Sequence, residues 1–188
     1  MNRLLLILMA LCLTGLIMCK SEDEKAMNEL SYRDSSAGQV QSITTYKVAK
    51  GFAIVKSHQI GDYTEEFLDI ELYNKDIDFD YKLCASLNQT DVDADLITLE
   101  VHPNGSEYEG VFGDDQGNEK WFRAYMIHNI ADPDGGLYSL TIEKVDTSRD
   151  GNLEAGGEIQ GEINIDLKDG THLQGPFLAE ICIPDYED

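Results

Sequence analysis

The chain has few basic residues for its length. Lys and Arg number 14 among 188 residues, against 36 Asp and Glu, so the formal net charge is −22. Nucleic-acid binders neutralise phosphates with clustered Lys and Arg, and many peripheral membrane proteins bind anionic lipids through similar basic clusters. The deficit argues against a nucleic-acid partner and against a basic membrane-docking patch. Hydrophobic residues make up 42%, which excludes wholesale disorder.

The chain also lacks the motifs of common enzyme and cofactor sites. It contains no G-x-S-x-G, H-E-x-x-H, P-loop or G-x-G-x-x-G segment, and no Cys/His spacing typical of zinc. We therefore predict that it is not an enzyme and carries no cofactor. A hydrolase with an acidic site is the alternative, because paired carboxylates can carry out glycoside hydrolysis.

Long hydrophobic runs are absent except at the N-terminus. Leu4–Met18 is almost uniformly apolar and follows Arg3, the only charged residue before it. At 15 residues the run is shorter than the roughly 20 that span a bilayer as a helix. A basic start, a short apolar run and a polar continuation are typical of an export signal. The sequence predicts a signal peptide over residues 1–18.

The apolar run ends in a cysteine. Leu16-Ile17-Met18-Cys19 resembles the lipobox of bacterial lipoproteins, with Met18 where that motif usually has Gly, Ala or Ser. The charged segment Lys20–Lys25 resembles the one that follows the cysteine in surface-exported lipoproteins of Bacteroidota. The resemblance implies that Cys19 carries the lipid that anchors the chain to the membrane. It also implies an outer-membrane lipoprotein, either periplasmic or surface-exposed; plain secretion and a retained anchor are the alternatives.

From about residue 40 the dominant hydrophobic period is two. Ile159, Ile163 and Ile165 alternate with polar residues, as expected for strands with one buried face. About nine or ten short strands with turn signals between them favour one all-β domain, an antiparallel β-sandwich or a barrel. The polar segment 19–38 is then a tether, and the domain spans 39–188.

Two turns predict how strands pair. Asn104-Gly105 is a strong two-residue hairpin signal, which would set Val101 opposite Tyr108. Lys168–Thr171 favours a three-residue loop with Gly170 in the left-handed region, which would set Ile165 opposite Leu173.

Cysteine is scarce, and only Cys84 and Cys182 lie in the expected domain. An exported protein folds in an oxidising compartment, and both cysteines have apolar neighbours typical of strands. We predict a disulfide between them; two unpaired thiols are the alternative.

One acidic segment resembles the start of an EF-hand loop. Asp146, Ser148 and Asp150 stand at positions 1, 3 and 5, and Gly151 stands at position 6. The Glu expected at position 12 is replaced by Gly157. A calcium site at Asp146, Ser148, Asp150 and Asn152 is one interpretation, and a solvated loop is the other.

Tryptophan occurs once, in an alternating segment. Trp121 and Tyr125 share one side of a predicted strand, and Phe122 lies on the other. If the Phe122 side is core, Trp121 and Tyr125 could stack on a ligand, either a glycan or a protein partner. Alternatively, the Trp121 side faces the core.

We predict an exported, lipid-anchored envelope protein with a binding or structural role. A secreted, calcium-stabilised domain that binds glycan or protein is the main alternative.

Overall fold

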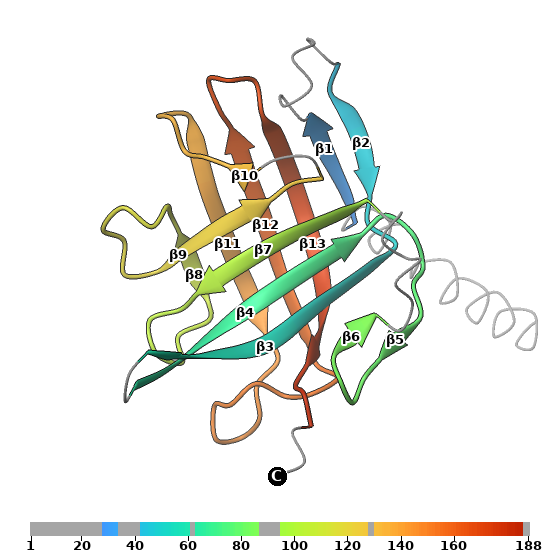
Figure 1. Cartoon of the computed structure of the whole chain (residues 1–188), viewed down its shortest axis with the longest axis vertical. Helices are drawn as coiled ribbons and strands as arrows, with labels where there is room; N and C mark the ends of the chain where they lie inside the picture. Colours follow the sequence, from blue (N-terminus) through green and yellow to red (C-terminus); the bar gives the residue numbers. More distant parts are fainter. Residues whose placement is uncertain (1–27, 34–41, 61–62, 87–94, 128–129, 186–188) are drawn as a thin grey trace, which may run out of the picture.

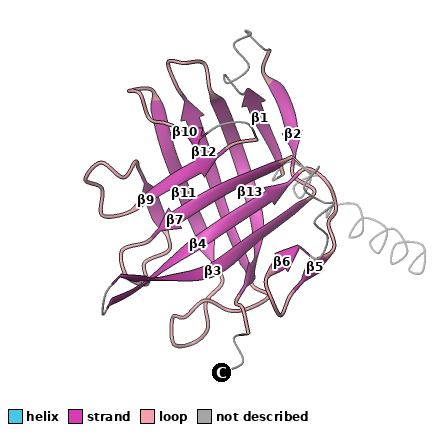
Figure 2. Ribbon diagram, viewed as in Figure 1, coloured by secondary structure: helices cyan, strands magenta, loops and turns pink. Residues whose placement is uncertain are grey.

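The computed structural model describes residues 28–33, 42–60, 63–86, 95–127 and 130–185. These residues form thirteen strands and no helix, which confirms the all-β class (Figure 2). No segment among them is a helix suited to crossing a membrane. The strands are β1 (Glu29–Arg33), β2 (Thr44–Lys47), β3 (Lys50–Ile60), β4 (Tyr63–Tyr73), β5 (Phe79–Asp80), β6 (Ala85–Ser86), β7 (Leu96–His102), β8 (Gly110–Phe112), β9 (Trp121–Tyr125), β10 (Ile130–Ala131), β11 (Leu137–Val145), β12 (Glu158–Asp166) and β13 (His172–Cys182).

Eleven of the described strands form one mixed sheet. Its order is β10-β9-β7-β4-β3-β13-β12-β11-β8, with β1 beside β13 and β2 beside β1. Neighbours are antiparallel except β3 and β13, which run parallel where Phe52 lies opposite Glu180. The prediction of a wholly antiparallel fold is therefore wrong at this pair. The barrel alternative is also wrong, because β10 and β8 end the path without pairing with each other.

The sheet folds over, so that two of its parts face each other (Figure 1). Strands β3, β4, β7 and β9 lie in front of β11, β12 and β13 and cross them at an angle. Leu99 and Phe122 from the front part share one hydrophobic core with Ile163 and Phe177 from the rear part. Along β12, buried and more exposed residues alternate, which confirms the predicted period of two. We call the surface of β4, β7 and β9 that faces away from this core the outer face.

The turn between β12 and β13 is confirmed. Gly170 has a φ of +97°, and the N–H of Leu167 donates to the carbonyl of Thr171 at 2.9 Å. Ile165 lies opposite Leu173, as expected from a three-residue loop. Glycine tolerates the left-handed conformation that this loop requires, so the local sequence alone determines the register.

The hairpin predicted at Asn104-Gly105 is wrong. Pairing after β7 is limited to one bridge between Asn104 and Glu107. Strand β7 lies between β4 and β9, and Val101 is opposite Phe122 rather than Tyr108. Strand β8 pairs with β11 instead. Because both edges of β7 are already occupied, residues 108–112 cannot extend a ladder along it.

The N-terminal boundary of the domain also needs correction. Strand β1 lies inside the predicted tether 19–38, yet it pairs with both β13 and β2. Leu30 on this strand is fully buried in the main core. Burial of that side chain makes β1 part of the folded sheet rather than a linker. Residues 1–27, with Cys19 and the predicted signal peptide, and residues 34–38 lie outside the described residues.

A small flap packs against β3 and the end of β13. It comprises residues 77–86 and contains the two-stranded sheet of β5 and β6. Phe79 of the flap stacks on Phe52 of β3, with ring centroids 3.6 Å apart. Cys84 and Cys182 form the predicted disulfide, with their Cα atoms 5.7 Å apart. The disulfide therefore fastens the flap to the last strand, and together they enclose a second hydrophobic cluster.

Candidate binding surface

Strand β9 carries its aromatic side chains outward. Phe122 and Ala124 are fully buried in the core, whereas Trp121 and Tyr125 are partly exposed and Arg123 is exposed. Successive residues of a strand point to opposite faces, so one side of β9 must be buried. The buried side is that of Phe122, and Trp121, Arg123 and Tyr125 therefore lie on the outer face.

Three rings stand side by side across this face. His102 of β7 lies between Trp121 of β9, with centroids 3.6 Å apart, and Phe67 of β4, at 5.1 Å. In both pairs the ring planes are nearly parallel, with interplanar angles of 9° to Trp121 and 8° to Phe67, so the rings are stacked. The register explains the arrangement, because His102 and Trp121 are directly opposite in the β7–β9 ladder. We call Phe67, His102 and Trp121 the ring stack.

His102 is held by two carboxylates as well as by two rings. Its Nδ1 lies 3.1 Å from Glu65, and its Nε2 lies 2.9 Å from Glu100. Ionised carboxylates only accept hydrogen bonds, so both contacts are satisfied together when both ring nitrogens carry a proton. Only 8% of His102 is exposed, so these contacts hold its ring in a fixed position between the two neighbouring strands.

Glu100 links His102 of the ring stack to Tyr125 of β9. Burial alone would raise the pKa of its carboxyl group, but hydrogen bonds from His102 and Tyr125 outweigh burial and lower the pKa. The Tyr125 hydroxyl donates to Glu100 at 2.9 Å. Burial and the bond to Glu100 raise the pKa of Tyr125 in turn. At neutral pH this corner holds an ionised carboxylate and a neutral phenol.

Arg123 connects the ring stack to a hollow beside it. Its guanidinium lies over the Trp121 ring, 5.2 Å from the centroid. It also donates to Asp115 at 2.6 Å, and this bond raises the pKa of Arg123. Because His102 stacks on the Trp121 ring and Arg123 lies near the same ring, these two neighbours restrict the access of a sugar ring to Trp121. The structure thus places Trp121 and Tyr125 on the surface but engages Trp121 with its own neighbours.

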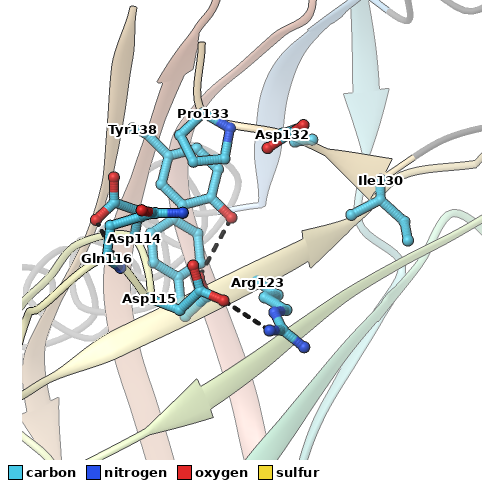
Figure 3. Close-up of a pocket in the computed structure, with 10 residues that line it drawn as sticks. Asp114, Asp115, Gln116, Arg123, Ile130, Asp132, Pro133 and Tyr138 are labelled. Atoms are coloured by element: carbon cyan, nitrogen blue, oxygen red, sulfur yellow. Dashed lines mark hydrogen bonds and ion pairs between the residues drawn. The ribbon is translucent and has the colours of Figure 1, made fainter. Parts of the chain in front are cut away.

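The hollow lies between β9, β10 and the segment 113–118, and has a volume of about 490 Å³ (Figure 3). Ile130, Pro133 and the ring of Tyr138 supply apolar walls. The hydroxyl of Tyr138 lies within hydrogen-bonding distance of Phe122 O (3.3 Å) and Ala124 N (3.1 Å). Burial raises the pKa of Tyr138, so it stays a neutral phenol there. Three carboxylates border the hollow, those of Asp114, Asp115 and Asp132.

In the candidate calcium loop, the first carboxylate is engaged by other groups of the chain. The carboxylate of Asp146 pairs with Lys144 at 2.9 Å and accepts the N–H of Glu158 at 3.1 Å. These bonds lower the pKa of Asp146, the contact with Lys144 having the larger effect. Ser148 and Asn152 contact each other through their backbones. No three His, Cys, Asp or Glu side chains converge on a metal position within the described ranges.

Sequence reasoning missed much of this surface. It singled out Trp121 and Tyr125 but not His102, Phe67 or Glu65, which come from other strands. The alternation in β4 and β7 was visible and could have placed these residues on one face. What the alternation could not supply is which strands are neighbours, and therefore which side chains meet.

The comparisons with known proteins give no relative for this arrangement. No family model, curated protein or solved structure matches the chain.

Proposed function

We propose that this chain is an exported, lipid-anchored envelope protein that binds a protein partner through its outer face. The leader and the lipobox-like segment ending at Cys19 support the anchor. The disulfide between Cys84 and Cys182 supports an oxidising compartment outside the cytoplasm. The proposed role is binding rather than catalysis, and we class the two facing parts of the sheet as a β-sandwich joined through β3 and β13.

One observation carries the choice of a protein partner. Trp121, Arg123 and Tyr125 lie together on the outer face, and Ile130 is directly opposite Tyr125 with 58% of its surface exposed. Trp, Tyr and Arg are the residues most enriched at the centres of protein interfaces. A glycan platform is less well supported, because the neighbours of Trp121 limit access to its ring faces.

Fractionation tests the anchor. Cells that export the full chain should hold it in the membrane fraction, and Cys19→Ala should release it. Cys12→Ala is the matched control, because it removes a leader cysteine outside the lipobox. If the Cys19→Ala protein still requires detergent for extraction, lipidation at this residue is refuted.

Photo-crosslinking tests the surface. A photoreactive residue at position 125 should give a discrete protein adduct in intact cells. The same residue in place of the exposed Glu162, on the rear part of the sheet, should give none. Adducts of equal yield from both positions would contradict a binding role for the outer face.

A further inference from the structure

The hollow beside β9 has carboxylates that its own cations do not neutralise. Arg123 is the basic residue in its lining, and its guanidinium is already bound to Asp115. Asp114 accepts hydrogen bonds from the N–H of Gln116 and from the side-chain amide of Asn118. Asp132 forms no ion pair with any residue that the structure describes. The hollow therefore keeps an excess of negative charge.

The same hollow has an apolar wall of the right kind for an aliphatic chain. Ile130 is exposed, and it lies with Pro133 on the side of the hollow that Asp132 borders (Figure 3). The Tyr138 ring closes the inner side, where it stacks on Phe122 with centroids 4.5 Å apart. An occupant that fits must combine a hydrocarbon stem with a positive charge at its end. Lysine and arginine side chains have this form.

We propose that the hollow receives a basic side chain of the protein partner. The inference rests on the proposed function, because it assigns a chemistry to the partner of that surface. The hydrocarbon stem contacts Ile130 and Pro133, and the cationic end lies near Asp132 and Asp114. The hollow adjoins Arg123 and the ring stack, so the basic side chain and the aromatic surface are engaged by one partner. Charge complementarity with a chain of net charge −22 also accelerates the encounter.

The structure contains its own reporter for this binding. Trp121 is the only tryptophan of the chain, and it contacts Arg123, which lines the hollow. Pentalysine added to the purified full-length protein should change the fluorescence of Trp121 in a saturable way. Pentalysine acetylated on every side chain should not, because it keeps the stems but loses the charges. Pentaarginine, run in parallel, shows whether the hollow accepts a guanidinium as well as an ammonium.

Two variants separate a site from general attraction to an acidic protein. Asp132→Asn should weaken pentalysine binding about three- to tenfold, as expected for a partly exposed charge pair. Asp150→Asn removes the same charge from an exposed loop elsewhere and should change binding less than about twofold. Ile130→Ser leaves the net charge unchanged and should also weaken binding, because it removes the apolar wall.

Equal losses in Asp132→Asn and Asp150→Asn, or no loss in Ile130→Ser, would overturn the proposal. Circular dichroism of each variant verifies that the fold is intact. The crosslink from position 125 does not depend on Asp132. A positive crosslink with negative pentalysine results would therefore overturn the basic occupant and leave the proposed function standing.

Discussion

The imidazole of His102 stacks on the indole of Trp121 at 3.6 Å while both of its nitrogens contact carboxylates. The three partners of His102 are distributed over three neighbouring strands. Glu65 belongs to β4, Glu100 to β7 and Trp121 to β9. His102 therefore joins three adjacent strands through its side chain, in addition to the backbone ladder.

Replacing His102 with Ala should destabilise the fold by about 2–3 kcal/mol, because two partly buried hydrogen bonds to carboxylates and the stacking on Trp121 are lost. Urea denaturation followed by circular dichroism measures the loss. His58→Ala, at an exposed position on β3, is the control and should remain within about 0.5 kcal/mol of the parent. A His102→Ala protein as stable as the control would show that the stack contributes little.

The contribution of Glu100 should depend on pH. Its pKa in the folded chain is lowered from the ordinary value of 4.5, so its charge stabilises the fold above that value. The stabilisation is lost as the pH falls through the lowered pKa. Glu100→Gln should therefore cost the most free energy of unfolding near neutral pH and progressively less below pH 4.5. Glu143→Gln, exposed on β11, serves as the control. A cost for Glu100→Gln that stays constant down to pH 3, about one and a half units below 4.5, would argue against this coupling.

Removing the disulfide should release the flap. The bond spans a sequence separation of 98, so chain entropy predicts a loss of about 4–5 kcal/mol when Cys84 and Cys182 are both replaced with Ser. Detachment of the flap would also expose the second hydrophobic cluster around Phe52 and Phe79. Urea denaturation measures the loss of stability, and the binding of a hydrophobic dye detects exposure of the second cluster. An unchanged dye signal would mean that stacking alone keeps the flap closed.

A glycine in β12 should resist substitution. The Phe177 ring lies 2.8 Å from where a Cβ of residue 161 would sit, and the carbonyl oxygen of Thr141 is closer still. Gly161→Ala should cost about 1–3 kcal/mol, the range for overpacking a core. At Gly170 nothing lies within 4 Å of an added Cβ, and Asn tolerates its left-handed backbone, so Gly170→Asn should cost less. Thermal unfolding of both variants checks this order, and the reverse order would refute the packing argument.

The loop at Gly170 shows what the sequence could predict about this fold. Its glycine, its length and the flanking alternation all lie within a few residues, and they agree on one register. The Asn104-Gly105 turn carried an equally strong local signal and failed. Whether residues 108–112 could pair with β7 depended on β4 and β9, which occupy both edges of β7.

The disulfide could be predicted from the sequence, whereas the candidate surface depends on which strands are neighbours. Cys84 and Cys182 could be paired because few other cysteines compete, so no knowledge of neighbouring strands was needed. The ring stack required three strands to be placed side by side in the correct register. The parallel pairing of β3 with β13 was equally inaccessible, since no turn connects those strands and alternation does not encode direction.

The position of β13 has a consequence for the order of events during synthesis. This strand pairs with β1, β3 and β12, and it follows all three in the sequence. The earliest strands therefore have no complete set of neighbours until the last strand has emerged from the ribosome. Formation of the central part of the sheet is therefore deferred until β13 has been synthesised, as expected for contacts between distant parts of a sequence. Until then, the edges of β1 and β3 that β13 covers in the folded chain stay unpaired.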